Sequence, residues 1–233
     1  MKVLGIDSSG MTATVALIED DKLIAEFTVN NKRTHSETLM PMIDKVLIAS
    51  ETDIRDVELL AIAAGPGSFT GLRIGAATVK GLGMSLDVPV AAIPTCEGLA
   101  MNLSGTDRLV CPLMDARRNQ VYTGLYRVSG DMPEAVIEQT ACDISEIVDK
   151  VNEAGEKVIF LGDGAAIFKE YIESNIRVEF SFANANASLQ RGASIASLGL
   201  LYQKAGKTVS VDEFTPVYLR PSQAERVREE KNA

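Results

Sequence analysis

Short runs of apolar, β-branched residues open the chain and predict three consecutive strands. These runs cover residues 2–9, 12–20 and 22–29. The polar turn from Glu19 to Lys22 is short, so the second and third strands should form a hairpin. Residues 36–50 carry the apolar spacing of a helix, with Ser36 as the expected N-cap and Pro41 in the second turn.

The remaining chain alternates strand patterns with helix patterns. In the first half we expect a strand at 57–65, a helix at 71–86, a strand at 88–93 and a helix at 95–103. In the second half we expect strands at 108–116, 119–130 and 134–140, a helix at 143–155, a strand and turn at 157–165, helices at 166–174 and 193–207, and an extended segment at 211–220. This order predicts an α/β fold of two lobes, each a mixed sheet with helices. We expect an N-terminal lobe at 1–105, a C-terminal lobe at 106–205 and a C-terminal segment at 206–233.

Composition narrows the function classes. The chain has 233 residues, of which 46% are hydrophobic, and its net charge is −9. A chain this acidic repels phosphate backbones, so tight binding of nucleic acid by the chain alone is not expected. Cys96, Cys111 and Cys142 are scattered, as in a protein of a reducing compartment. No apolar run is long enough to span a membrane, and we expect a cytoplasmic protein without a membrane partner.

The glycine-rich segment 64–81 starts like a loop and continues like a helix. It fits neither a Walker A loop nor a dinucleotide-binding fingerprint, because its glycine spacing is wrong and Leu72-Arg73 stands where Lys-[Ser/Thr] is needed. We favour a sharp turn capped by Ser68 or Thr70, with Gly71 and Gly75 letting another helix approach. The alternative is an anion site at the start of the helix.

Candidate catalytic groups are few. The chain has one histidine, His35, so a serine peptidase using Ser68 would have to recruit it, and no nucleophile elbow is present. One histidine and three dispersed cysteines make no common zinc set, so neither a metallopeptidase nor any other metal site is expected, although carboxylates could still hold magnesium. Asp7, Ser8 and Ser9 end the first strand and resemble the start of actin-like and sugar-kinase-like ATPases. They fit equally well a polar turn that satisfies its own hydrogen bonds.

Two helices are apolar over an unusually broad face. Between residues 39 and 47 the apolar positions cover an arc of roughly 160°, wider than the ~100° of a one-sided helix. Between residues 72 and 86 only Arg73 and Lys80 are charged, and Met40, Met42 and Met84 suit an adaptable contact surface. Either these helices lie deep in a core, or they share one face with another chain.

Several segments together resemble the bacterial TsaB family, formerly called YeaZ. They are "LGIDSSG", "THSETLMPMID", "AGPGSFTGLRIG", "AIPTCEGLA", "MDARRNQVYTGLY" and "PVYLRPSQAE". The resemblance implies the two-lobed fold of the acetate kinase, Hsp70 and actin superfamily, with the final helix and the 206–233 segment returning to the first lobe. It also implies a part in making threonylcarbamoyladenosine at position 37 of tRNA. There a partner enzyme makes threonylcarbamoyl-adenylate, the paralogue TsaD transfers the group, and TsaE is an ATPase.

The same resemblance implies a non-catalytic subunit. TsaD-like chains carry two metal-binding histidines where this chain has Thr95 and Leu99, and "GDGA" at 162–165 is only a vestige of a nucleotide loop. We therefore expect no catalytic residue and no cofactor on the chain itself, although ATP or ADP could bind at the junction of the assembled complex. The alternative is an ATP-dependent enzyme of this fold acting alone, which calorimetry with magnesium and ATP on the monomer would reveal.

The expected partners are TsaD in a heterodimer and TsaE, with a homodimer when the chain is alone and tRNA contacted only through the complex. By resemblance, the partner interface comprises His35, Leu39, Met42, Ile43, Val46, Gly71, Leu72, Arg73, Ile74, Gly75 and Thr78. The vestigial nucleotide or anion site comprises Asp7, Ser8, Ser9, Gly65, Gly67 and Ser68.

Overall fold

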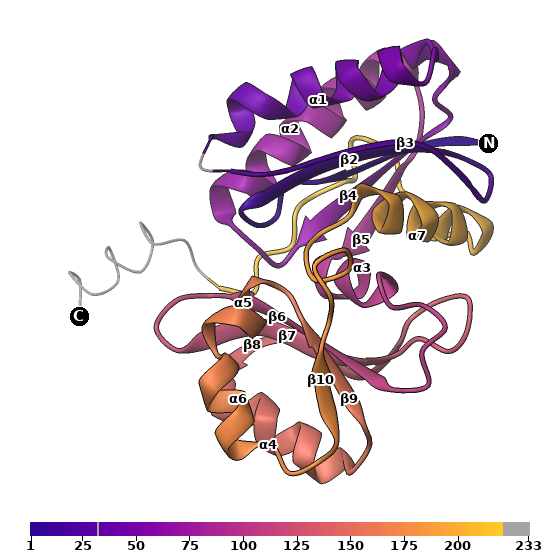
Figure 1. The fold of residues 1–233 in the computed structure, drawn as a ribbon. Coiled ribbons are helices and arrows are strands. Elements are labelled where there is room, and N and C mark those ends of the chain that lie inside the picture. The colour runs from indigo at the N-terminus through magenta and orange to yellow at the C-terminus, as the bar shows by residue number, and fades with distance from the viewer. Residues whose placement is uncertain (32, 221–233) are drawn as a thin grey trace.

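A computed structural model describes residues 1–31 and 33–220, which form two lobes with a five-stranded mixed sheet each (Figure 1). The predicted pair of α/β lobes is thus confirmed. The first sheet has the order β3-β2-β1-β4-β5 and comprises β1 (Lys2–Asp7), β2 (Thr12–Glu19), β3 (Lys22–Asn30), β4 (Leu59–Gly65) and β5 (Val90–Pro94). The second has the order β10-β9-β6-β7-β8 and comprises β6 (Leu109–Asp115), β7 (Gln120–Arg127), β8 (Glu134–Asp143), β9 (Val158–Leu161) and β10 (Phe180–Phe182).

Strand β1 is central to the first sheet. It pairs antiparallel with β2, which places Leu4 opposite Leu17, and parallel with β4, which places Leu4 opposite Leu60. Nearly every residue of these strands is buried, because helices cover both faces of the sheet. The predicted hairpin of β2 and β3 is also present.

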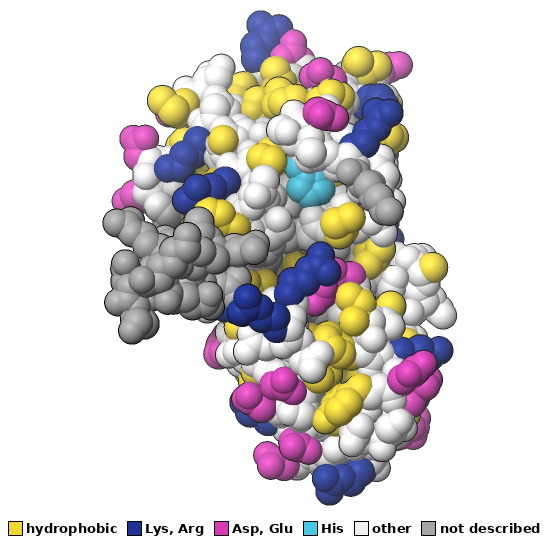
Figure 2. All heavy atoms as spheres, turned by 90° about the vertical axis from the view of Figure 1, so that its left-hand side faces the viewer, with side chains coloured by type: hydrophobic (Ala, Val, Ile, Leu, Met, Phe, Trp, Pro, Cys, Tyr) yellow, Lys and Arg dark blue, Asp and Glu magenta, His cyan; other side chains and the backbone are white. Residues whose placement is uncertain are grey.

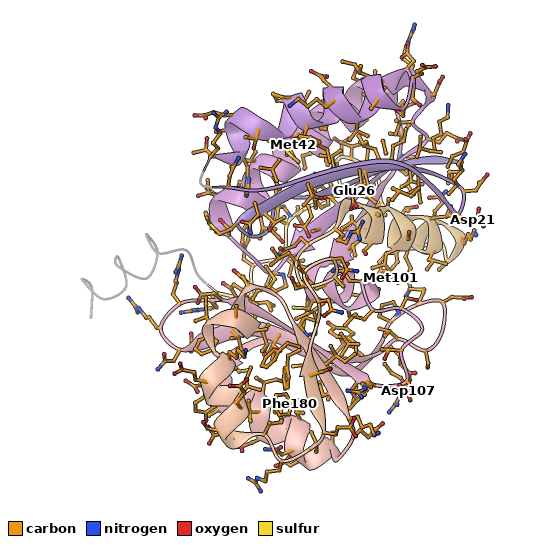
Figure 3. The ribbon with its side chains drawn as sticks, in the orientation of Figure 1. Asp21, Glu26, Met42, Met101, Asp107 and Phe180 are labelled. Carbon is orange, nitrogen blue, oxygen red and sulfur yellow. The ribbon has the colours of Figure 1, made fainter. Side chains whose placement is uncertain are left out.

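Helices α1 (His35–Ala49) and α2 (Phe69–Leu86) cover one face of the first sheet, and α7 (Gly192–Lys204) covers the other (Figure 1). Met42 points from α1 toward the sheet (Figure 3). The expected return of the final helix to the first lobe is confirmed, since α7 packs on the first sheet. The first lobe therefore includes Gly192–Lys204 in addition to the segment expected from residue 206.

The second sheet is covered on one face by α4 (Ile144–Ala154), α5 (Asp163–Ile167) and α6 (Lys169–Asn175). Its other face packs on α3 (Thr95–Met101), whose Cys96, Leu99 and Ala100 join a core cluster with residues of β6, β7 and β9. The helix α3 therefore lies between the lobes and holds them together through apolar contacts.

The C-terminal segment runs along the first lobe as far as it is described. Val209 pairs with Val90 at the edge of β5, Phe214 is buried, and the Val217 amide donates to the Ala64 carbonyl oxygen at 2.7 Å. The rest of the expected returning segment, residues 221–233, lies outside the described residues.

Several local predictions need correction. Helix α1 begins at His35 and its N-cap is Thr34 rather than Ser36, and Pro41 lies inside the helix. The helix expected at 166–174 is two short helices, because the backbone leaves helical geometry at Phe168. The 3-10 helix η1 (Ile54–Asp56) and strand β10 were not predicted, since three residues are too few for a periodic pattern. Among the described residues, no helix combines the length and the apolar character that a bilayer crossing requires.

Glycine at position 199 lets α7 approach the first sheet. A Cβ atom added there would lie 2.4 Å from the Ala61 Cβ, whereas one added at Gly81 of α2 would meet no heavy atom within 4 Å. We predict that Gly199→Ala lowers the free energy of unfolding by about 1–3 kcal/mol through overpacking. The matched change Gly81→Ala should raise it by up to about 1 kcal/mol, because alanine favours a helix interior. Urea unfolding measures both, and a similar effect of the two substitutions would contradict the packing role of Gly199.

Candidate functional site

The glycine-rich segment packs on the turn between β1 and β2. The Ser68 amide donates to the Ser9 carbonyl oxygen at 2.6 Å, and the Ser8 hydroxyl donates to the Gly71 carbonyl oxygen at 2.9 Å. A Cβ at Gly67 would lie 2.3 Å from the Ser9 carbonyl oxygen, and one at Gly71 would lie 2.0 Å from that of Ser8. Because Gly67 and Gly71 have no Cβ, the turn between β1 and β2 of the same lobe can pack directly against them. This corrects the expectation that Gly71 lets another helix approach.

The helix start is capped as expected. Ser68 is the N-cap of α2, and its hydroxyl accepts a hydrogen bond from the Gly71 amide at 3.3 Å. At Gly75 an added Cβ would lie 2.5 Å from the Ser8 hydroxyl oxygen. The first turns of α2 therefore pack directly against Ser8. The glycine-rich segment is a sharp turn whose glycines allow this close packing.

Asp7 lies beneath this contact and is 1% exposed. One carboxylate oxygen accepts the Ser9 amide at 2.8 Å and the Ser9 hydroxyl at 2.6 Å. Burial raises the pKa of Asp7 to about 6, an effect only partly offset by the two Ser9 hydrogen bonds and by nearby His35. The His35 ring is held by a 2.8 Å hydrogen bond between Nε2 and the Gly10 carbonyl oxygen.

The residues of the expected vestigial site therefore come together, with one difference in role. Asp7, Ser8, Ser9, Gly67 and Ser68 form one contact between the strand turn and the loop. Gly65 has a φ of +119°, and a Cβ there would lie 2.1 Å from the Val217 carbonyl oxygen. It therefore accommodates the C-terminal segment instead of the strand turn.

A cleft of about 350 Å³ opens between the lobes beside this contact. The first lobe contributes Ser9–Met11 and Gly67–Phe69, and the second contributes Met114–Arg117, Tyr122 and Asp163. Asp115 forms an ion pair with Arg117 at 3.0 Å, and Arg220 donates to the Ala116 carbonyl oxygen at 2.6 Å. Lysine and arginine side chains gather at the level where the lobes meet (Figure 2).

The charged groups of this cleft are paired with partners inside the chain. Its two arginines are already engaged, and the facing carboxylates of Asp115 and Asp163 offset their charge. Burial raises the pKa of Asp163, whose carboxylate already accepts the Asp115 amide. Within the described parts of the chain, no three His, Cys, Asp or Glu side chains are grouped so that they could hold a metal ion.

The two positions at which the family resemblance implies metal-binding histidines in the catalytic proteins, Thr95 and Leu99, are inside the core. Thr95 is 0% exposed and Leu99 is 1% exposed, and both lie on α3 between the lobes. Leu99 belongs to the apolar cluster that joins the lobes, so its side chain is committed to packing. Neither residue faces solvent from which a substrate could arrive.

Most of the expected partner-interface residues are also inside the core. Leu39, Met42, Ile43 and Val46 are at most 2% exposed and pack on the first sheet. Gly71, Leu72 and Gly75 are buried as well. A partner cannot reach these side chains, so their assignment to the interface is corrected, while His35, Arg73, Ile74 and Thr78 remain at the surface.

Other apolar residues of the same helices face outward. Met40 and Ile48 of α1 are 45% and 76% exposed, and Met84 of α2 is 72% exposed. We call these three residues, together with half-buried Ile74, the outer helix face. Sequence reasoning singled out Met40 and Met84 but missed Ile48. Its position lies about 120° around the helix from Met42, which would have indicated an outward side chain.

Comparison with known proteins identifies relatives over nearly the whole chain. Residues 22–226 match the family model described as TsaD, tRNA N6-adenosine threonylcarbamoyltransferase. The chain is 34% identical over 225 residues to the tRNA threonylcarbamoyladenosine biosynthesis protein TsaB of Bacillus subtilis (strain 168), covering 97% of this chain and 96% of the relative. The protein of the same name from Haemophilus influenzae is 28% identical, with 94% of each chain covered.

Solved structures show the same fold. YeaZ from Pseudomonas aeruginosa superimposes with a TM-score of 0.80 at 24% identity, covering 94% of this chain and 99% of that one. An inorganic polyphosphate/ATP-glucomannokinase from Arthrobacter sp. strain KM gives a TM-score of 0.52 at 11% identity, covering 87% and 99%. The two-lobed fold expected from the resemblance is therefore confirmed.

The raised pKa of Asp7 makes stability depend on pH. Because the folded pKa of about 6 exceeds the ordinary value of 3.8, the folded protein holds a proton that the unfolded chain releases, and stability falls as pH rises between these values. We predict that Asp7→Asn gains stability relative to the wild type by roughly 2 kcal/mol between pH 4 and pH 6.5. The asparagine oxygen can still accept both Ser9 hydrogen bonds. Urea unfolding at a series of pH values tests this, and parallel curves for the two proteins would contradict it.

Proposed function

The chain belongs to the TsaB family of tRNA threonylcarbamoyladenosine biosynthesis proteins, and from this premise we propose that it acts in that tRNA modification as a non-catalytic subunit. In this proposal its outer helix face binds the catalytic paralogue TsaD, and the pair recruits TsaE. ATP or ADP would then bind at the junction of the assembled complex, since Arg117 and Arg220 in the cleft of this chain already have partners inside the chain.

The outer helix face is the observation that carries the proposal. Ile48 and Met84 expose 76% and 72% of their surface on neighbouring helices of one lobe. Large apolar side chains gathered in this way are typical of protein contacts, and methionine adapts to a partner surface. Exposed Ala77 and Gly81 lie beside them on α2, and such small residues let a partner helix approach closely.

The paralogue is the partner that best suits this face. The family model that the chain matches describes TsaD itself, so the two proteins share one ancestral fold. A related chain would present an equivalent helix pair, and two such pairs would pack as four helices in a pseudo-symmetric dimer. In the absence of that partner, the same face should bind a second copy of this chain.

The interior of α3 supports the non-catalytic role. Thr95 is completely buried, so its hydroxyl group is not accessible to a metal ion or a substrate. Leu99 has no atom that could bind a metal. The side chains packed around Leu99 come from α3 and from β6, β7 and β9 of the second lobe, so their contacts stabilise the fold at the expense of a metal site.

Charged substitutions on the outer helix face test the partner assignment. We predict that Ile48→Glu and Met84→Glu each weaken binding to the host's TsaD by roughly tenfold or more, because a carboxylate would be buried in the interface. Folding should be unaffected, since both side chains are mostly exposed. Calorimetric titration gives the affinity, and urea unfolding gives the stability.

The matched control is Val136→Glu. Val136 is 46% exposed on β8 of the second lobe, far in the fold from α1 and α2, so this variant should bind TsaD like the wild type. Wild-type affinity in both helix variants would exclude the outer helix face as the interface. The core change Ile43→Glu is unsuitable, because Ile43 is 1% exposed.

Reconstitution tests the pathway role. We predict that a mixture of this chain, TsaD, TsaE and the enzyme that makes threonylcarbamoyl-adenylate modifies tRNA, and that omission of this chain lowers the yield severely. The chain supplied alone with threonylcarbamoyl-adenylate should give no modified adenosine, as measured by mass spectrometry of digested tRNA. Modification by the highly purified chain alone would show that it is an enzyme.

A further inference from the structure

One side of α2 carries a regular series of charged and apolar positions. Met84 follows Lys80 by four residues, and Asp87, the C-cap of the helix, follows Met84 by three, so the three side chains lie on the same side. Met84 is 72% exposed. Its exposed neighbour Gly81 faces open space, because an added Cβ there would meet no heavy atom within 4 Å. We call these four residues the α2 stripe.

The two charges of the α2 stripe are free to pair with another molecule. Within residues 1–31 and 33–220, neither the Lys80 ammonium group nor the Asp87 carboxylate takes part in an ion pair. They cannot reach each other, since seven residues of helix separate them by about 10 Å along the axis. The α2 stripe therefore presents one cation and one anion outward.

The anion lies where a cation is favoured. The C-terminus of a helix carries a partial negative charge, and the last turn of α2 contains no basic residue to offset it. A groove of about 570 Å³ beside this end is lined by Met84, Asp87 and Asp212, and its described lining holds neither lysine nor arginine. Both carboxylates are exposed. A basic side chain from outside the chain would therefore be attracted to this groove.

A second α2 in antiparallel orientation supplies that cation. The midpoint between Lys80 and Asp87 falls at residues 83 and 84, so a twofold axis beside Met84 brings Lys80 of each copy to Asp87 of the other. The same axis brings each Met84 to the open space at Gly81 of the other helix. Charge and shape are therefore complementary to one occupant, which is a second copy of this chain.

We propose that two copies of this chain recognise each other through antiparallel α2 helices, with an ion pair between Lys80 of each copy and Asp87 of the other. The inference rests on the proposed function, which assigns the outer helix face to protein contacts, and it adds the residues that fix how two such faces are oriented. The competing acceptor for Lys80 on this face is Asp44, which is exposed on α1 between Met40 and Ile48.

Exchange of the two charges tests the pairing, with sedimentation equilibrium of the full chain as the measurement. We predict that Lys80→Glu and Asp87→Lys each raise the dissociation constant of the dimer at least about tenfold, because each creates two like-charge contacts across the axis. The double variant should return to within about threefold of the wild type, because both ion pairs form again in reverse. An equimolar mixture of the two single variants should also dimerise, since one supplies two carboxylates and the other two ammonium groups.

Two control variants accompany this exchange. Lys150→Glu changes an exposed charge on α4 of the second lobe and should dimerise like the wild type. Lys80→Glu combined with Asp44→Lys should remain dissociated, and urea unfolding checks that every variant is folded. Recovery of the dimer in that combination, but not in the exchange of Lys80 with Asp87, would overturn the proposed pairing.

The outcomes separate this inference from the proposed function. If Met84→Glu dissociates the dimer while both single charge variants dimerise like the wild type, the ion pairs are excluded and the outer helix face stands. A wild type that stays monomeric at every concentration would overturn recognition between copies. The titration of TsaD with Ile48→Glu and Met84→Glu would then still decide the proposed function.

Discussion

The close contact between the start of α2 and the turn that follows β1 is the constraint on which the first lobe depends. The backbone of Gly71 lies so near the Ser8 carbonyl oxygen that an added Cβ would be 2.0 Å from it, and Gly67 approaches Ser9 equally closely. Only glycine permits both approaches, because every other residue carries that atom. The contact fixes where α2 begins, and the sheet then determines which side of α2 is buried and which side is exposed.

The same contact also occupies the polar groups at the end of β1. The loop lies on Ser9, and Ser9 in turn donates both of its hydrogen bonds to Asp7. The Asp7 carboxylate is consequently excluded from solvent, and it is held by the turn that follows β1 instead of facing the cleft. On the opposite wall, Asp115 and Arg117 satisfy each other. The polar groups on both walls of the cleft are therefore committed to internal contacts.

Local patterns predicted the elements well but not their surroundings. The short polar turn at 19–22 was enough to predict the β2–β3 hairpin, and the order of patterns was enough to predict two mixed sheets. Periodicity showed that α1 is broadly apolar, yet it could not show that Met42 faces the sheet while Met40 faces solvent. That distinction depends on how α1 packs on β2, a tertiary contact between distant residues. The return of α7 to the first sheet likewise depends on close approaches at Gly192 and Gly199 that no local pattern encodes.

The outer helix face depends on the same sheet. Its residues lie on helices of 15 and 18 residues, whose inner sides pack along the first sheet. Because this support fixes both helices, the exposed side chains keep one arrangement, and the proposed partner would meet a preformed surface.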